Sequence, residues 1–397
     1  MTTYRKIYLK QGKEESLLRF HPWVFSGAIA KADNGLEEGE VVDVFTARGA
    51  FIARGHFQIG SIAVRVLTFD EGEQIDADYW QRRLSQARQV RVSLGLVGSM
   101  DTDTYRLVHG EGDNLPGLVI DIYGHTAVMQ AHSAGMHLSR LEIAKALQTV
   151  MAGVVEHIYY KSESTLPFKA DLLARENGFI IGGSDYNIGL ENGLRFRVDW
   201  LKGQKTGFFV DQRDNRLLLQ RYARGRRVLN MFCYTGGFSI YAMRGEAALV
   251  HSVDSSAKAI ELTNENVSLN FPGDSRHEAF AEDAFKFLDR MGSLYDLVIL
   301  DPPAFAKHRD ALRNALRGYT KLNAKAMEKM PPGSLLFTFS CSQVVTKDQF
   351  RAAVFTAAAQ CRRNVRILHQ LTQPGDHPVG IYHPEGEYLK GLVLYLE

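Results

Sequence analysis

The sequence predicts a multidomain α/β protein whose last part is a doubly wound sheet. The apolar runs 297–300 and 335–339 are short and bounded by chain-breaking residues, which is typical of buried parallel strands. From residue 186 onward such runs alternate with helical periods, the pattern of a parallel sheet covered by helices. At 397 residues the chain is long enough for two or three domains, because single cores rarely exceed roughly 250–300 residues.

The region before this sheet predicts two smaller domains. Residues 1–75 contain short alternating strands separated by glycine-marked turns, so we expect a small β-barrel with strands at 6–9, 40–45, 51–53 and 63–67. Residues 76–185 predict a central α+β domain, with helices at 77–96 and 138–151 and strands at 105–107, 118–121, 127–131 and 155–160. The glycine-bearing segment 170–185 lacks a regular period, so we expect a linker leading into a third domain, 186–397.

Composition excludes several classes of protein. The apolar content of 45% and charged content of 23% describe an ordinary soluble globular protein. Three cysteines without a Cys-x-x-Cys spacing predict neither a disulfide framework nor a metal site. The polar N-terminus and the lack of a long apolar run predict no signal peptide and no membrane span, so we expect a cytoplasmic protein. The net charge of +2 does not by itself indicate a nucleic-acid partner.

The ends of the first two expected strands of the third domain predict a cofactor site. Strand 227–232 runs into the turn Cys233-Tyr-Thr-Gly-Gly-Phe238, and strand 249–253 ends at Asp254. Glycines let a backbone approach its ligand closely, and an acidic residue at a strand tip suits a ribose diol. A dinucleotide site would require Gly-x-Gly-x-x-Gly, so a nicotinamide dehydrogenase is disfavoured. S-adenosylmethionine, which has a ribose and no phosphate, fits better.

Later residues extend this predicted site. A third strand near 277–280 leads to Asp283, which could accept a hydrogen bond from an adenine amino group, although Asp254 and Asp283 could instead be helix caps. The residues expected to contact the cofactor are Phe208, Phe209, Gln212, Phe232, Tyr234, Thr235, Gly236, Asp254, Ser255, Asp283, Ala284 and Asp301.

Two short motifs predict the catalytic edge. Asp301-Pro302-Pro303 closes the run 297–300, and Ser340-Cys341-Ser342 closes the run 335–339. In an open α/β sheet, ligands bind at the carboxyl ends of the strands, so a carboxylate and a thiol should lie at one edge. A thiol placed there can be a nucleophile, although a free cysteine is more often a small buried hydrophobic residue.

Six segments, taken in order, resemble the ribosomal RNA large subunit methyltransferase I family: 16–27 (SLLRFHPWVFSG), 203–216 (GQKTGFFVDQRDNR), 233–238, 301–303, 339–342, and 377–378 with 387–391. The similarity covers nearly the whole chain. It implies an N-terminal PUA domain, a central α+β domain and a C-terminal class I (Rossmann-like) methyltransferase domain. It also implies that RNA is the partner and that the product is 5-methylcytosine in 23S ribosomal RNA. A homodimer is left open.

The implied reaction assigns roles to the two motifs. Carbon 5 of cytosine becomes nucleophilic only after a thiolate adds at carbon 6, and Cys341 is the candidate for that step. Asp301 would hydrogen-bond the exocyclic amine or a protonated ring nitrogen of the flipped base. Pro302 and Pro303 would shape the turn against the base, and Phe305 could stack on it or simply pack. Arg213 could meet an RNA phosphate or an internal carboxylate.

The chain departs from many RNA 5-methylcytosine enzymes at one position. Those enzymes carry a second cysteine just after the proline that follows their aspartate, whereas this chain has Ala304 and Phe305 in that region. The base that removes the carbon-5 proton is therefore unassigned, and Lys307, His308 and ordered water are all candidates.

Three other functions compete with this interpretation. A guanine-N7 methyltransferase on a related scaffold would not need the thiol of Cys341. An exocyclic-amine methyltransferase would not need it either, and commonly has an aromatic residue where this chain has Ala304. A non-catalytic RNA-binding protein is disfavoured because Asp254, Asp283, Asp301 and Cys341 are all present.

Overall fold

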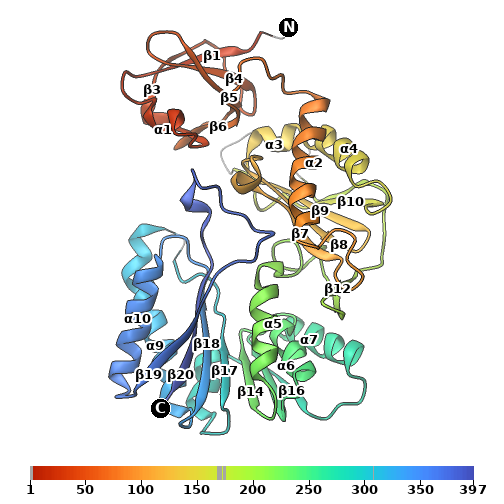
Figure 1. Cartoon of the computed structure of the whole chain (residues 1–397), viewed down its shortest axis with the longest axis vertical. Helices are drawn as coiled ribbons and strands as arrows, with labels where there is room; N and C mark the ends of the chain where they lie inside the picture. Colours follow the sequence, from red (N-terminus) through yellow and green to blue (C-terminus); the bar gives the residue numbers. More distant parts are fainter. Residues whose placement is uncertain (1–2, 168–171, 173–175, 307) are drawn as a thin grey trace. The chain divides into compact units, whose positions relative to one another are not determined.

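The computed structural model describes residues 3–167, 172, 176–306 and 308–397, and the chain divides into two compact units (Figure 1). Unit 1 comprises residues 1–193, 198–210 and 375–386. Unit 2 comprises residues 194–197, 211–374 and 387–397. The domain boundaries expected at 75/76 and 185/186 remain predictions.

Unit 1 begins with a mixed sheet, in the order β2-β6-β5-β4-β1-β3, around a core that includes Ile7, Val44 and Val64. Its elements are β1 (Arg5–Leu9), α1 (Glu15–Leu18), β2 (Trp23–Phe25), β3 (Ile29–Ala32), β4 (Val41–Phe45), β5 (Phe51–Phe57) and β6 (Ile62–Thr68). Sequence reasoning missed β2 and β3. Both are short and largely solvent-facing, so no alternating apolar pattern marks them.

A second sheet, β11-β10-β9-β8-β7, packs with helices to form the rest of the unit 1 core. Its elements are α2 (Ala77–Ser93), β7 (Thr104–His109), β8 (Leu118–Tyr123), β9 (Thr126–Ala131), α3 (Ala134–Leu138), α4 (Arg140–Val150), β10 (His157–Tyr160) and β11 (Gly178–Ile181). The expectation of a linker at 170–185 was wrong for 178–181. This segment pairs antiparallel with β10, and the ring centroids of Phe179 and Tyr159 lie 5.1 Å apart.

The segment 375–386 belongs to unit 1 although it follows most of unit 2 in the sequence. Arg91, on α2, has no solvent exposure and donates to both carboxylate oxygens of Asp113, at 2.5 and 2.8 Å. The same guanidinium donates to the backbone carbonyl of Asp376 at 2.6 Å, and the Asp376 carboxylate accepts from the Arg106 N–H at 3.0 Å. These bonds attach the segment to α2 and β7.

Unit 2 is built on the sheet β16-β15-β14-β17-β18-β20-β19. Strands β14 to β18 pair in parallel, whereas β20 lies antiparallel between β18 and β19. The strands are β14 (Arg227–Met231), β15 (Leu249–Asp254), β16 (His277–Ala281), β17 (Leu297–Leu300), β18 (Ser334–Ser340), β19 (Val365–Leu371) and β20 (Lys390–Leu396). β17 and β18 are buried along their whole length, which is why they read as continuous apolar runs. This is the doubly wound sheet that the sequence predicted, with one antiparallel strand added.

The helices of unit 2 connect these strands (Figure 1). They are α5 (Arg213–Tyr222), α6 (Gly237–Arg244), α7 (Ala257–Asn270), α8 (Ala284–Arg290), α9 (Leu312–Lys329) and α10 (Lys347–Gln360). Of two further short strands, β12 (Ile188–Glu191) belongs to unit 1 and β13 (Leu194–Arg197) to unit 2. Within the described ranges, no helix combines the length and the apolar character needed to cross a membrane.

Candidate active site

The parallel register brings the predicted motifs to one edge of the sheet. Met231 lies opposite Leu300, and Leu300 lies opposite Thr338, so β14, β17 and β18 end at a common level. The residues that follow these positions include Phe232, Asp301 and Cys341. The predicted cofactor turn and both predicted catalytic motifs therefore begin at the same carboxyl edge, where ligands bind in sheets of this kind.

The turn after β14 has an unusual backbone. Phe232, Tyr234 and Gly236 all have positive φ, at 58°, 48° and 79°. Such angles are costly for residues other than glycine, so neighbouring groups must hold the turn in place. Thr263 donates to the Tyr234 carbonyl at 2.9 Å, and Asn266 donates to the Thr235 carbonyl at 3.0 Å. A Cβ at Gly236 would lie 2.7 Å from Thr263 Cγ2, so the turn fits closely against α7.

The two acidic residues predicted for the cofactor differ in their contacts. Asp254 is partly buried, and its carboxylate accepts from the backbone N–H groups of Tyr234 (3.1 Å) and Ser256 (2.9 Å). Asp283 is exposed and caps α8 by accepting from the Lys286 N–H at 3.0 Å. Its alternative role as a helix cap is thus present in the structure. Ser255 is exposed, and Ala284 is buried at the start of α8.

Asp301 lies in a strongly polar cluster. Its Oδ2 accepts from the Gln212 side-chain amide at 3.0 Å. Burial and the negative charge of Asp211 raise the pKa of Asp301 to about 7, against the opposing effects of Gln212 and Arg216. Asp211 itself accepts from the Tyr388 hydroxyl at 2.6 Å. A carboxyl group with this pKa can both release and accept a proton near neutral pH.

The Asp301 loop and the Cys341 loop are joined through Ser342 and Tyr319. Ser342 Oγ accepts from the Ala306 N–H at 3.4 Å and lies 3.1 Å from the Tyr319 hydroxyl. That hydroxyl also accepts from Ser340 Oγ at 2.9 Å. Tyr319 stacks on Phe305 with ring centroids 4.6 Å apart. The residues on both sides of Cys341 are therefore fixed to the loop that follows Asp301.

Lys390 is the residue of this edge that sequence reasoning missed. It is 5% exposed, begins β20 opposite Ser340, and donates from Nζ to the carbonyls of Ser342 (2.6 Å) and Val345 (2.7 Å). Burial lowers the pKa of Lys390 to about 8, and the charges of Cys341 and Glu387 act in the opposite direction. A buried ammonium thus interacts electrostatically with the candidate nucleophile. A lysine at the start of an apolar strand gives no sequence signal of its own. Its position beside the Cys341 loop follows only from the antiparallel pairing of β20 with β18.

The burial and contacts of the remaining predicted site residues do not by themselves assign them a role. Pro302 is buried and Pro303 exposed, while Phe305 is partly buried against Tyr319. Arg213 is 5% exposed and lies 3.5 Å from the Asp214 carboxylate. Phe208 is buried and Phe209 partly buried, and both belong to unit 1, whereas Gln212 and Arg213 belong to unit 2. His308 is exposed, and Lys307 lies outside the described residues.

One group in unit 1 has the composition of a metal site. His21, His383 and Glu385 each offer a ligand atom, and these atoms lie within 4.8 Å of one another. However, His21 Nδ1 accepts from the Trp23 N–H at 3.2 Å, and its Nε2 is the nitrogen near Glu385, at 3.6 Å. In neutral histidine an accepting Nδ1 leaves the proton on Nε2, so the latter offers no lone pair to an ion. We assign no metal to this group.

Comparisons with known proteins agree with this architecture. A family model described as S-adenosylmethionine-dependent methyltransferase matches residues 182–380, and one described as a PUA-like domain matches residues 7–69. Ribosomal RNA large subunit methyltransferase I of Tolumonas auensis is 42% identical over 395 residues, 98% of each chain. The protein of the same name from Erwinia tasmaniensis is 40% identical over 392 residues, 97% of this chain and 98% of that protein.

Solved structures show the same fold. A SAM-dependent methyltransferase from Streptococcus mutans has a TM-score of 0.83 at 22% identity, covering 98% of this chain and 99% of that chain. A methyltransferase crystallised in complex with SAH has a TM-score of 0.84, with the same identity and coverage.

The residues of the carboxyl edge fit S-adenosylmethionine. Each carboxylate oxygen of Asp254 accepts one backbone N–H and keeps capacity for a ribose hydroxyl. Gly236 leaves no side chain between the turn and α7. With 42% identity over nearly the whole chain, this protein belongs to the ribosomal RNA large subunit methyltransferase I family, and it is a SAM-dependent methyltransferase with an N-terminal PUA-like domain.

Proposed function

We propose that this protein methylates carbon 5 of a cytosine in large-subunit (23S) ribosomal RNA, through a covalent adduct with Cys341. The observation that carries the proposal is the junction of the two catalytic loops, in which Ser342 and Tyr319 hold the flanks of Cys341 to the Asp301 loop. The relatives are named as ribosomal RNA methyltransferases, and these names support ribosomal RNA as the substrate. The thiol distinguishes this chemistry from guanine-N7 methylation, which would not use it.

The reaction begins with Cys341. Its thiolate forms a bond to carbon 6 of the flipped cytosine, and the C5=C6 electron pair shifts through the ring toward N3. Asp301, whose pKa is about 7, supplies a proton to N3 as negative charge develops there. Bound S-adenosylmethionine would supply an electrophilic methyl group and would leave as S-adenosylhomocysteine.

Carbon 5 takes up that methyl group as N3 returns its proton to Asp301. A base then removes the carbon-5 proton, the C5=C6 bond re-forms, and the bond to Sγ breaks, so the Cys341 thiolate is regenerated. The Lys390 ammonium has an electrostatic interaction with Cys341. We therefore propose that Lys390 favours the ionised form of Cys341, since an opposite charge nearby lowers a thiol pKa.

The test is to incubate the protein with labelled S-adenosylmethionine and unmodified 23S RNA, and to identify the product nucleoside by mass spectrometry. We expect 5-methylcytidine from wild type and none from Cys341→Ala, with cofactor binding retained. Cys361→Ala is the matched control, because that partly buried thiol lies at the C-terminal end of α10 and donates to the Ala324 carbonyl of α9. It should stay active.

The adduct itself can be trapped. RNA containing 5-fluorocytidine cannot lose a proton from carbon 5 after methylation, so the bond to Sγ should persist in denaturing gels. Wild type and Cys361→Ala should show this complex and Cys341→Ala should not. Methylation of a guanine, or full activity without the Cys341 thiol, would overturn the cytosine proposal and favour the guanine-N7 reaction.

A further inference from the structure

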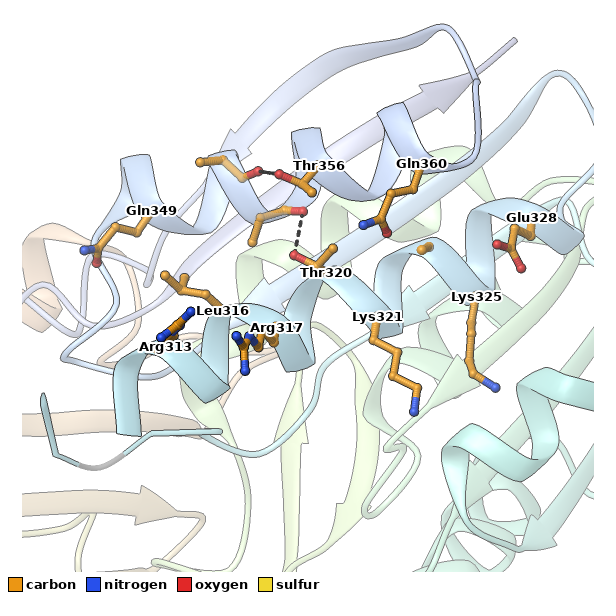
Figure 2. Close-up of a pocket in the computed structure, with 13 residues that line it drawn as sticks. Arg313, Leu316, Arg317, Thr320, Lys321, Lys325, Glu328, Gln349, Thr356 and Gln360 are labelled. Carbon is orange, nitrogen blue, oxygen red and sulfur yellow. Dashed lines mark hydrogen bonds between the residues drawn. The ribbon is translucent and has the colours of Figure 1, made fainter. Parts of the chain in front are cut away.

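Helices α9 and α10 enclose a groove outside the catalytic edge. It has a volume of about 750 Å³ and an apolar floor that includes Leu316, Ala352 and Ala353. A hydrogen bond joins the two helices: the Thr320 hydroxyl of α9 donates to the Ala353 carbonyl of α10 at 3.2 Å. Figure 2 shows four cationic side chains along α9, namely Arg313, Arg317, Lys321 and Lys325, of which Lys321 and Lys325 point away from α10. The uncharged polar side chains of Gln349, Thr356 and Gln360 line the groove from α10.

Helix α9 is strongly basic, although the chain as a whole is nearly neutral. This helix carries five Lys or Arg residues and one Glu, whereas the whole chain has a formal net charge of only +2. Residues four apart are neighbours on the surface of a helix, about 6 Å apart along its axis, so the cations follow one ridge that winds slowly around α9. Such a row destabilises a helix by like-charge repulsion unless an anion compensates it.

The cations at the N-terminal end of α9, nearest the loops of the proposed site, are the ones available to bind an external anion. Lys325, near the C-terminal end, pairs with Asp289, and Glu328 lies beside it. Among residues whose placement is described, no salt bridge joins a carboxylate to Arg313 or Arg317. Lys321 lies over the Phe285 ring at 5.5 Å and interacts electrostatically with Asp289 without a salt bridge to it. Arg313 is the second residue of α9, and α10 begins shortly after Cys341, so the cationic end of the groove adjoins the loops of the site.

We propose that the α9–α10 groove is a binding track for the phosphate backbone of the substrate RNA beside the target nucleotide. The proposal rests on the proposed function for its RNA substrate. Regularly spaced cations suit regularly spaced phosphates, and guanidinium groups bind phosphate bidentately. The amide and hydroxyl groups of α10 can hydrogen-bond ribose hydroxyls across the groove. By contrast, residues 1–70 contain nearly equal numbers of basic and acidic side chains, so the barrel offers no comparable charge.

The experiment measures the affinity of a 23S RNA fragment as a function of salt, for wild type and for R313Q/R317Q/K321Q. Glutamine keeps much of the aliphatic stem and removes the charge. If three phosphate contacts are lost, the slope of log K against log salt should fall by about 2, and affinity at low salt should drop roughly tenfold or more. The matched control R195Q/R224Q/K258Q removes three exposed cations from other elements of unit 2 and should leave the slope nearly unchanged.

Further measurements separate the outcomes. R313K/R317K keeps the charge and should restore most of the affinity, and S-adenosylmethionine binding should be unaffected by every variant. Equal salt slopes for wild type and the triple glutamine variant would overturn the proposal. So would an unchanged RNA affinity with an altered oligomeric state, which would assign the groove to a second copy of the chain. Because binding is measured directly, a product other than 5-methylcytidine would refute the proposed reaction without touching this result.

Discussion

Lys390 Nζ lies 2.6 Å from the backbone carbonyl oxygen of Ser342, the residue that follows Cys341. The ammonium therefore bonds to the loop that contains Cys341 and has an electrostatic interaction with the Cys341 thiol. Lys390 Nζ donates hydrogen bonds to the backbone carbonyl groups of Ser342 and Val345. The two carbonyl acceptors hold the ammonium in place, and its charge would in addition favour the ionised form of the proposed nucleophile.

We predict that Lys390→Met lowers kcat/KM at pH 7 by roughly tenfold to a thousandfold. A neighbouring opposite charge shifts a pKa by about 1–3 units, which is the corresponding loss of thiolate. The deficit should shrink as pH rises toward 9, because the thiol then ionises without help. A pH-rate profile checks this. A deficit that stays constant across pH would show that Lys390 only supports the loop.

The second prediction concerns the proton held by Asp301. Its raised pKa of about 7 means that the carboxyl is protonated below pH 7 and ionised above it. If the protonated form is the one that acts on N3, kcat/KM should fall as pH rises through about 7.

Two variants should move this descending limb in opposite directions. Asp211→Asn removes the negative charge that helps to raise the pKa of Asp301, so the limb should move to lower pH. Gln212→Leu removes the hydrogen bond that opposes the shift, so the limb should move to higher pH. If the descending limb moved in the same direction in both variants, or moved in neither variant, Asp301 would be excluded as the titrating group.

The third prediction tests the cofactor turn through Gly236. Alanine there must adopt φ near 79°, and its Cβ would lie 2.7 Å from Thr263 Cγ2. The clash should displace the turn and weaken S-adenosylmethionine binding about tenfold or more, beyond the cost of the left-handed backbone itself. Gly225→Ala is the control, because it has φ of 70° and open space around it. Isothermal calorimetry should show near-normal cofactor affinity for Gly225→Ala; equal losses in both variants would mean that strain, not the fit against α7, governs binding.

Much of unit 2 could be predicted from local sequence. Strand 297–300 was predicted with its observed bounds, because a fully buried strand leaves a continuous apolar run. The contacts of the site could not be predicted in the same way. Lys390 reaches Ser342 only through the antiparallel pairing of β18 with β20, and Phe305 reaches Tyr319 through the packing of α9. The cationic spacing on α9 was visible in the sequence, but its groove depends on α10.

The last prediction concerns the segment 375–386 and the fully buried Arg91. Arg91→Ala would leave the Asp113 carboxylate buried without its partner and would remove the bond to the Asp376 carbonyl. Breaking a buried pair in this way costs about 3–5 kcal/mol, so unfolding of unit 1 should occur at lower denaturant. Arg82→Ala breaks the exposed pair with Glu73 and should cost less than about 1 kcal/mol. Hydrogen exchange should show faster exchange of 375–386 in Arg91→Ala and unchanged protection of β14 and β17. Equal stability of the two variants would mean that Asp113 finds water or another donor, and that Arg91 does not hold the segment in place.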